Sequence, residues 1–153
     1  MTVYDKLKAL DITLAAPAAP VAAYVMYVQT GNLVFISGHL ARKADGSVIA
    51  GQLGKNISVD EAKAAARGIA VAMLGTLEQA CGGDLGRVKR IVKIMSLVNS
   101  TPDFTEQHIV TNGASELIGE VFGEAGKHAR SAFGVAQIPL GACVEIEMIA
   151  EVA

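Results

Sequence analysis

The segment between Ser58 and Gly83 constrains the fold more than any other part of the sequence. Ser58 and Glu61 form a capping box, in which the serine hydroxyl and the glutamate carboxylate each bind a backbone N–H group at the start of a helix. Gly82 and Gly83 are typical of residues that end a helix. The apolar residues between these signals fall on one helical stripe: Ala62, Ala65, Ala66, Ile69, Met73, Leu77 and Ala80. Because most of them are small, this helix can pack closely against a sheet.

Strand-forming sequence lies before this helix. Residues 24–29 and 33–38 are rich in Val, Ile, Tyr and Phe and flank a turn at Gly31-Asn32, which predicts a hairpin. Asp45-Gly46 is a second strong turn signal, and it predicts a further strand pair within residues 33–50. We therefore expect antiparallel strands ahead of the helix.

A further strand and a second helix are expected after it. Residues 90–98 form a β-rich run whose lysine and serine interruptions are typical of a partly exposed strand. A helix is predicted from residue 102 or 103 to Gly123, although two internal glycines weaken it.

The chain closes with two predicted strands, residues 131–138 and 142–152, which a turn at Pro139-Leu140-Gly141 joins as a hairpin. The order of elements is then β-β-α-β-α-β-β. This order indicates an α+β fold with a mainly antiparallel or mixed sheet and two helices packed on one face. The other face would remain uncovered by this chain, so we expect a closed, symmetric homo-oligomer that covers it.

Residues 1–23 are expected to form a short helix and an extended connector. Val3, Leu7 and Leu10 are spaced as on one face of a helix, and Thr2 is a suitable cap for it. The Ala- and Pro-rich stretch that follows favours extended backbone, because proline excludes helix. That stretch is too short and too interrupted by proline for a membrane span.

Composition and charge exclude several classes of function. The 153 residues are 52% hydrophobic and 18% charged, which fits one folded domain, residues 1–153, and excludes disorder. A net charge of -2 with scattered basic residues leaves no footprint for nucleic acid. Cys81 and Cys143 lie far apart without ligand spacing, so we expect neither a metal site nor a disulfide. A soluble, cytoplasmic protein fits these features.

The last predicted strand carries carboxylates on one face. Its residues alternate between an apolar set, Val144, Ile146, Met148 and Ala150, and a second set, Glu145, Glu147, Ile149 and Glu151. This alternation is typical of a strand with one buried face. Carboxylates in such a pattern most often form a solvated outer face.

Arg130 lies ahead of this strand among small residues that carry no charge of their own. An arginine at the start of a strand is most often a surface charge or the partner of a nearby glutamate. Here its neighbours leave it partly desolvated, and a guanidinium in such a place can bind a planar carboxylate through two parallel hydrogen bonds. Of the three histidines, His128 lies nearest to it in the sequence, and no two are spaced as a ligand pair.

The segment from His128 to Ala150, HARSAFGVAQIPLGACVEIEMIA, resembles the signature of the Rid family, also called YjgF or endoribonuclease L-PSP proteins. The resemblance rests on an Arg-Ser pair, a later proline and a Glu-Ile-Glu run. Upstream residues also fall at the family's spacings, and these are Tyr24, Gly31-Asn32, Ser37-Gly38 and Asp45-Gly46. The resemblance implies a fold like the small trimeric chorismate mutases, with clefts between the subunits of a homotrimer.

The resemblance also implies a site that hydrolyses enamine and imine intermediates to 2-keto acids and ammonia. Arg130 would bind the carboxylate of a small imino or keto acid, and Glu145 would position or activate the attacking water. The substrate-binding positions would be Tyr24, Ser37, Gly38, Asn112 and Ala132. Because an imine is already electrophilic, positioning it beside a water needs neither a metal nor a cofactor.

Two departures from the family pattern indicate a divergent subgroup. Ala132 stands where deaminase members carry a cysteine, and the segment from Phe104 to Arg130 is longer than in compact members. Two other functions therefore stay open. One is an endoribonuclease activity, which the acidic pI of about 5.9 disfavours. The other is a non-catalytic homotrimer that binds small carboxylates.

Overall fold

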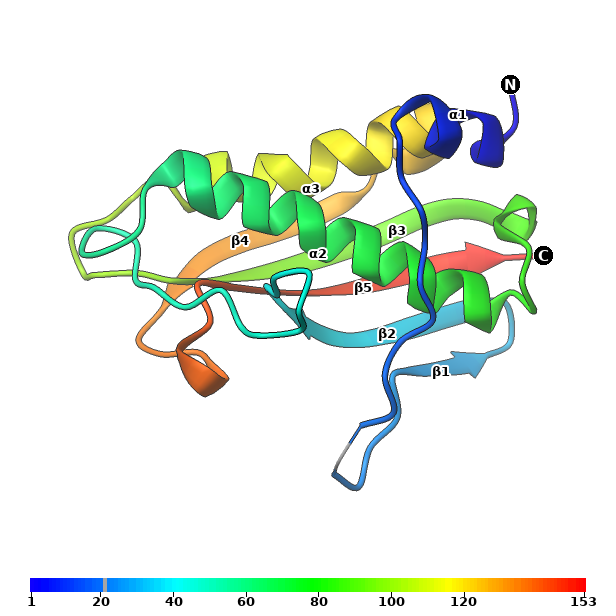
Figure 1. Ribbon diagram of the computed structural model, residues 1–153. Coiled ribbons are helices and arrows are strands. Elements are labelled where there is room, and N and C mark those ends of the chain that lie inside the picture. The colour runs from blue at the N-terminus through cyan, green and yellow to red at the C-terminus, as the bar shows by residue number, and fades with distance from the viewer. Residues whose placement is uncertain (21) are drawn as a thin grey trace.

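The structure is a computed structural model that describes residues 1–20 and 22–153. Two long helices lie side by side across one face of a five-stranded sheet (Figure 1). The strands are β1 (Tyr27–Thr30), β2 (Leu33–Leu40), β3 (Val88–Asn99), β4 (Ala129–Val135) and β5 (Val144–Val152). The helices are α1 (Val3–Ala9), α2 (Val59–Ala80) and α3 (Gln107–Phe122). The predicted α+β fold, with α2 and α3 on one face of a mixed sheet, is confirmed.

The predicted capping box begins α2. The Glu61 N–H donates to Ser58 Oγ at 3.1 Å, and the Ser58 N–H donates to Glu61 Oε1 at 3.3 Å. The apolar stripe of α2 lies in one core with the inner face of the sheet, and both include fully buried side chains: Ile69, Met73, Leu74, Leu77, Ile94, Ile146 and Met148. Burying one such side chain contributes roughly 1.5–3 kcal/mol, so this stripe holds the helix layer on the sheet.

Gly113 lets α3 lie directly against the backbone of α2. A Cβ at this position would overlap the carbonyl oxygen of Lys63 and lie 3.0 Å from its carbonyl carbon. The glycine that weakens the helix in isolation is therefore required by its packing.

The connector crosses α2 at a similar close approach. A Cβ at Gly75 would overlap the carbonyl oxygen of Ala15. Thr2 caps α1 as predicted, in a capping box with Asp5. Figure 1 shows α1 beside α3 and the connector running across α2 toward β1. No helix in the described ranges is long and apolar enough to cross a bilayer.

Two local predictions are wrong: the start of the second helix and the second strand pair. Helix α3 begins at Gln107 and not at residue 102 or 103, because Thr101 Oγ1 donates to Asp103 Oδ1 at 2.7 Å in a turn that precedes it. The second predicted strand pair is reduced to a single bridge between Arg42 and Val48, since β2 already has β1 and β5 as neighbours.

The predicted closing hairpin is also wrong. The strand order β1-β2-β5-β3-β4 places β3 between the last two strands, and β4 runs parallel to β3. The Pro139–Gly141 turn therefore belongs to a connection that passes across β3, and it does not join neighbouring strands. Strand β5 takes the centre of the sheet because its apolar face, from Val144 to Val152, is buried along its whole length.

Within the described residues, no helix covers the other face of the sheet, and several apolar side chains on that face are exposed. Phe35 is 41% exposed, Phe133 is 43% exposed and Val28 is 54% exposed. Val28 is paired with Phe35, and Phe133 lies beside Leu97. Large apolar side chains gathered on one open face are typical of a surface that binds another protein.

Candidate functional site

Glu145 lies on the open face of the sheet. It is on β5, where the residues on either side of it, Val144 and Ile146, point into the core. Its neighbours across the strands are Leu40 on β2 and Leu97 on β3. The side chain is half-buried, and burial disfavours the charged form of its carboxyl group.

Gly38 provides the space that the Glu145 carboxylate occupies. A Cβ at Gly38 would overlap Glu145 Oε1 and lie 3.0 Å from Glu145 Cδ. The register of β2 and β5 shifts between Ile36 and His39, so Gly38 sits in an irregularity of the strand. Such irregularities often aim a side chain near a functional site.

The environment of Glu145 favours its neutral form. Burial raises the pKa of the carboxyl group above its usual range, and the negative charge of Glu147 on the same face adds to this. Within residues 1–20 and 22–153, Glu145 forms no salt bridge that would oppose the rise. A raised pKa makes the carboxylate a stronger proton acceptor than an ordinary glutamate.

Ser37 ties the segment before β1 to the same place. Its N–H donates to Met26 O at 2.9 Å, and its hydroxyl donates to Val25 O at 2.6 Å. Residues 22–26 lie in a loop that projects beyond β1 (Figure 1), and Tyr24 in this loop is 55% exposed. We call Tyr24, Ser37, Gly38 and Glu145 the acidic half-site.

Arg130 lies on β4 and points to the opposite face of the sheet. It pairs with the buried Ile94, and its guanidinium reaches α3. Nη1 donates to Ser115 Oγ at 3.1 Å, and Nη2 donates to the His108 carbonyl oxygen at 3.3 Å. Both partners are neutral, and none of the salt bridges among the described residues includes Arg130.

Ala132 and Asn112 lie near Arg130. Ala132 follows it by two residues on β4, so both point to the helix side of the sheet. Asn112 is half-buried on α3, one turn after His108 and just before Ser115, and it therefore shares the helical stripe that Arg130 contacts. We call Arg130, Ala132 and Asn112 the arginine half-site.

The two half-sites are separate within one chain. Strand β3 lies between β4 and β5, which puts Arg130 and Glu145 about 10 Å apart across the strands. Arg130 is level with Ile94 and Glu145 with Leu97, so the register adds about 10 Å along the strands. Their side chains also leave opposite faces. The predicted closing hairpin would have made the strands of Arg130 and Glu145 neighbours, but β3 lies between them.

The sequence did not single out Ser115, although it contacts both Arg130 and His128. Its Oγ lies 2.9 Å from His128 Nε2. Nothing in the local pattern links these positions, because the contact depends on how α3 packs beside β4. His39 is different: it is buried, with its ring nitrogens 2.7 Å from Ser37 O and 2.8 Å from Thr76 Oγ1, which gives it a structural role.

The cysteine missing at position 132 has no substitute nearby. Cys143 is fully buried, and burial raises the pKa of its thiol to about 11. It therefore remains a neutral thiol at physiological pH. In the described ranges, no group of three His, Cys, Asp or Glu side chains is arranged to hold a metal ion.

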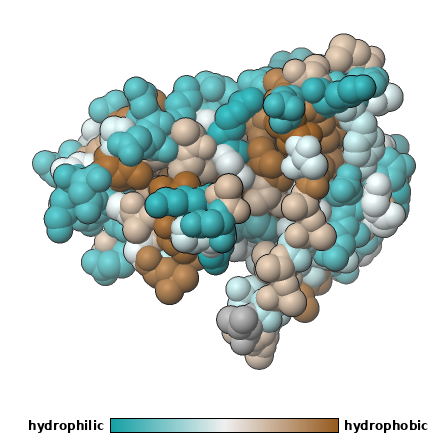
Figure 2. All heavy atoms as spheres, viewed as in Figure 1, coloured by the Kyte–Doolittle hydropathy of each residue, from teal (hydrophilic) through white to brown (hydrophobic). Residues whose placement is uncertain are grey.

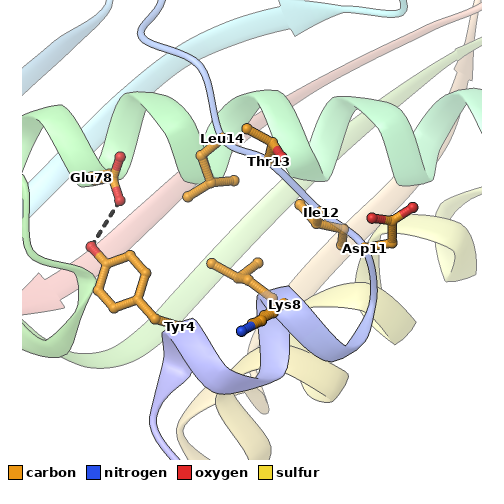
Figure 3. Close-up of a pocket in the computed structure, with 8 residues that line it drawn as sticks. Tyr4, Lys8, Asp11, Ile12, Thr13, Leu14 and Glu78 are labelled. Carbon is orange, nitrogen blue, oxygen red and sulfur yellow. Dashed lines mark hydrogen bonds between the residues drawn. The ribbon is translucent and has the colours of Figure 1, made fainter.

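Two hollows lie apart from both half-sites. One, of about 330 Å3, is bounded by α1, the connector and α2 (Figure 3), where Tyr4 Oη donates to Glu78 Oε2 at 2.8 Å. Figure 2 shows apolar side chains gathered in this region. The other, of about 540 Å3, lies beyond the ends of β3 and β4 and includes Gln107 and Gly134. Neither includes Arg130 or Glu145.

The structure is that of a small α+β protein with a mixed sheet and two helices on one face. Among the described residues, its Arg130 has no acidic partner and its Glu145 is half-buried. The model of the family described as "YjgF/chorismate mutase-like, putative endoribonuclease" matches residues 5–152. The chain belongs to this family, which is the one that its sequence resembles.

Three similar proteins can be compared in detail. A Trypanosoma cruzi protein named TCP17 is 50% identical over 146 residues, which are 95% of this chain and 91% of that protein. A solved Agrobacterium tumefaciens protein of unknown function is 39% identical, with a TM-score of 0.91 over 99% of this chain and 94% of that one. A Psychrobacter RidA is 27% identical, with a TM-score of 0.59 over 90% and 94% of the two chains. The fold is thus nearer to the Agrobacterium protein than to this RidA.

Proposed function

We propose that the protein hydrolyses enamine and imine intermediates of amino acids to 2-keto acids and ammonia. The active unit is a homotrimer, and each site combines the arginine half-site of one subunit with the acidic half-site of another. This proposal explains why one chain carries both half-sites but keeps them apart. Covering the open sheet face with further copies also removes its exposed apolar side chains from water.

One observation carries the proposal most directly. Arg130 forms hydrogen bonds only to neutral groups among the described residues, while Glu145 is half-buried without a cation. Each group lacks the partner that would neutralise it. A small substrate with a carboxylate and an imine supplies both partners at once.

The reaction follows from these roles. Arg130 binds the substrate carboxylate and fixes the direction of the imine carbon. Glu145, as a carboxylate, accepts a proton from water while the water oxygen bonds to that carbon. That proton passes to the nitrogen and gives a carbinolamine, which carries a hydroxyl and an amino group on one carbon. Glu145 then takes the hydroxyl proton and delivers it to the amino nitrogen, the carbon–nitrogen bond breaks, and ammonia leaves as the carbonyl group of the 2-keto acid forms. Proton transfer of this kind contributes roughly 10²- to 10⁴-fold, and positioning supplies much of the remainder.

Mixing two inactive variants tests the shared site. Arg130→Ala and Glu145→Gln should each abolish keto-acid formation from an imino acid generated in the assay. When the two variants are refolded together, random assortment pairs intact halves at about one quarter of the contacts, so about that fraction of activity should return. Arg90→Ala, at an exposed arginine of β3, is the matched control and should keep full activity.

The same preparations separate the alternatives. Sedimentation should give the mass of three 15.8 kDa chains. If mixing restores nothing although both variants assemble, the site is not shared between subunits. Saturable binding of a keto acid without ammonia release would identify a binding protein. RNA cleavage that is lost in Arg130→Ala would favour the endoribonuclease activity in the family's description.

A further inference from the structure

A chain of hydrogen bonds runs behind Arg130. His128 Nδ1 lies 2.6 Å from the Gly126 carbonyl oxygen, and His128 Nε2 lies 2.9 Å from Ser115 Oγ. Ser115 Oγ in turn accepts a hydrogen bond from Arg130 Nη1 at 3.1 Å. Ser115 lies in the middle of α3, Gly126 in the turn after this helix, His128 just before β4, and Arg130 on β4.

The chemistry of the partners determines where the protons lie. A carbonyl oxygen only accepts hydrogen bonds, so His128 Nδ1 carries a proton and donates to Gly126. In the neutral ring Nε2 then has a free lone pair and accepts the hydroxyl proton of Ser115. The serine oxygen keeps its own lone pairs for the Arg130 N–H. Each of the three contacts therefore has one donor and one acceptor.

The far end of this chain is rigid. A Cβ at Gly126 would lie 2.6 Å from the Ile118 carbonyl oxygen and 3.2 Å from Phe122 Cβ, so its backbone packs directly on α3. Burial lowers the pKa of His128, and the positive charge of Arg130 adds to this. Both effects keep the ring neutral, as the proton arrangement requires.

We propose that Ser115 and His128 are positioning residues that hold the Arg130 guanidinium in the orientation that binds a substrate carboxylate. The inference rests on the proposed function of Arg130. Ser115 accepts a hydrogen bond from one guanidinium nitrogen and the His108 carbonyl from another, so three of the five N–H groups are left for the ligand. A long arginine side chain would otherwise lose much of its rotational freedom on binding, which weakens affinity.

Substitutions at two positions test this role. Ser115→Ala removes the acceptor, and loss of a hydrogen bond to a charged group should raise KM for the imino acid roughly tenfold while kcat changes little. Ser115→Thr keeps the hydroxyl and should restore KM. Glu116→Ala alters the next residue of α3, which is exposed and takes no part in these hydrogen bonds, and it should leave KM unchanged.

A pair of His128 variants separates the two ends of the ring. The Gln amide oxygen can replace Nε2 as the acceptor for Ser115, whereas the shorter Asn reaches only toward Gly126. His128→Gln should therefore keep a lower KM than His128→Asn. This pair also decides the question if Ser115→Ala does not fold. Equal KM values for both variants and wild type would overturn the proposal.

Two further readouts distinguish the possible failures. Nitrogen NMR of His128 should show a protonated Nδ1 and a free Nε2, and a reversed assignment would overturn the proposal. In some enzymes a histidine in such a contact activates the serine as a nucleophile. Covalent labelling of Ser115 by a fluorophosphonate would thus assign it a catalytic role in place of a positioning one.

If wild type neither turns over an imino acid nor binds a keto acid, both proposals fall. If wild type is active and Ser115→Ala keeps its KM, only this one does.

Discussion

Replacing Gly38 with alanine should disable Glu145 without unfolding the protein. The new Cβ would lie 3.0 Å from Glu145 Cδ and would overlap Oε1. Carbon atoms pack at about 3.5–4.0 Å, so the carboxylate must withdraw by roughly 0.5–1 Å. A displacement of about 1 Å at a reacting group lowers turnover by about 100-fold. Because the side chain is only half-buried, it can move toward water, and the free energy of unfolding should fall by no more than about 1–3 kcal/mol.

The assay compares ammonia release and thermal unfolding for Gly38→Ala and for Gly68→Ala. Gly68 lies in α2 with open space where its Cβ would be, so that alanine should stabilise the helix by roughly 0.5–1 kcal/mol and leave turnover unchanged. A displaced Glu145 would be less buried, which should lower its pKa and move the acidic limb of the rate profile to lower pH. Wild-type turnover in Gly38→Ala would refute the reasoning.

Three further predictions concern stability and assembly. Gly113→Ala should lower the free energy of unfolding by roughly 1–3 kcal/mol because its Cβ meets the backbone of α2, whereas Gly119→Ala, with open space, should not; denaturant titration compares them. His39 is buried and burial lowers its pKa, so the unfolded chain takes up a proton first as the pH falls below about 6.5 and stability is lost; His39→Gln should remove this slope in unfolding measured against pH. Phe133→Asp on the open face should dissociate the proposed trimer in sedimentation, and an unchanged mass would show that this face is not an interface.

Local patterns in the sequence predicted most of the individual elements. The cap at Thr2 and the capping box at Ser58 placed the starts of α1 and α2 correctly, because the partners of a cap lie within three residues. The alternation of β5 correctly placed Glu145 on the face opposite the buried residues. The start of α3 was less accurate, since the turn at Thr101 competes with the helix for the same residues.

The sequence could not predict which strands are neighbours. A hairpin between the last two strands is the simplest reading of a short turn, yet β5 pairs with β2 and β3, which come much earlier in the chain. Such pairings depend on burying the apolar face of β5 at the centre of the sheet, and no local signal reports that. The contact between Ser115 and His128 could not be predicted from the sequence for the same reason.

The sequence by itself determined the family, the residue types of the candidate site and the face on which Glu145 lies. These follow from motifs and from the period of a strand, which are properties of neighbouring residues. Only the tertiary structure decided that Arg130 and Glu145 leave opposite sides of the sheet and belong to separate half-sites. Strand order decides this, and it is set by contacts between distant segments that bury the largest apolar area together.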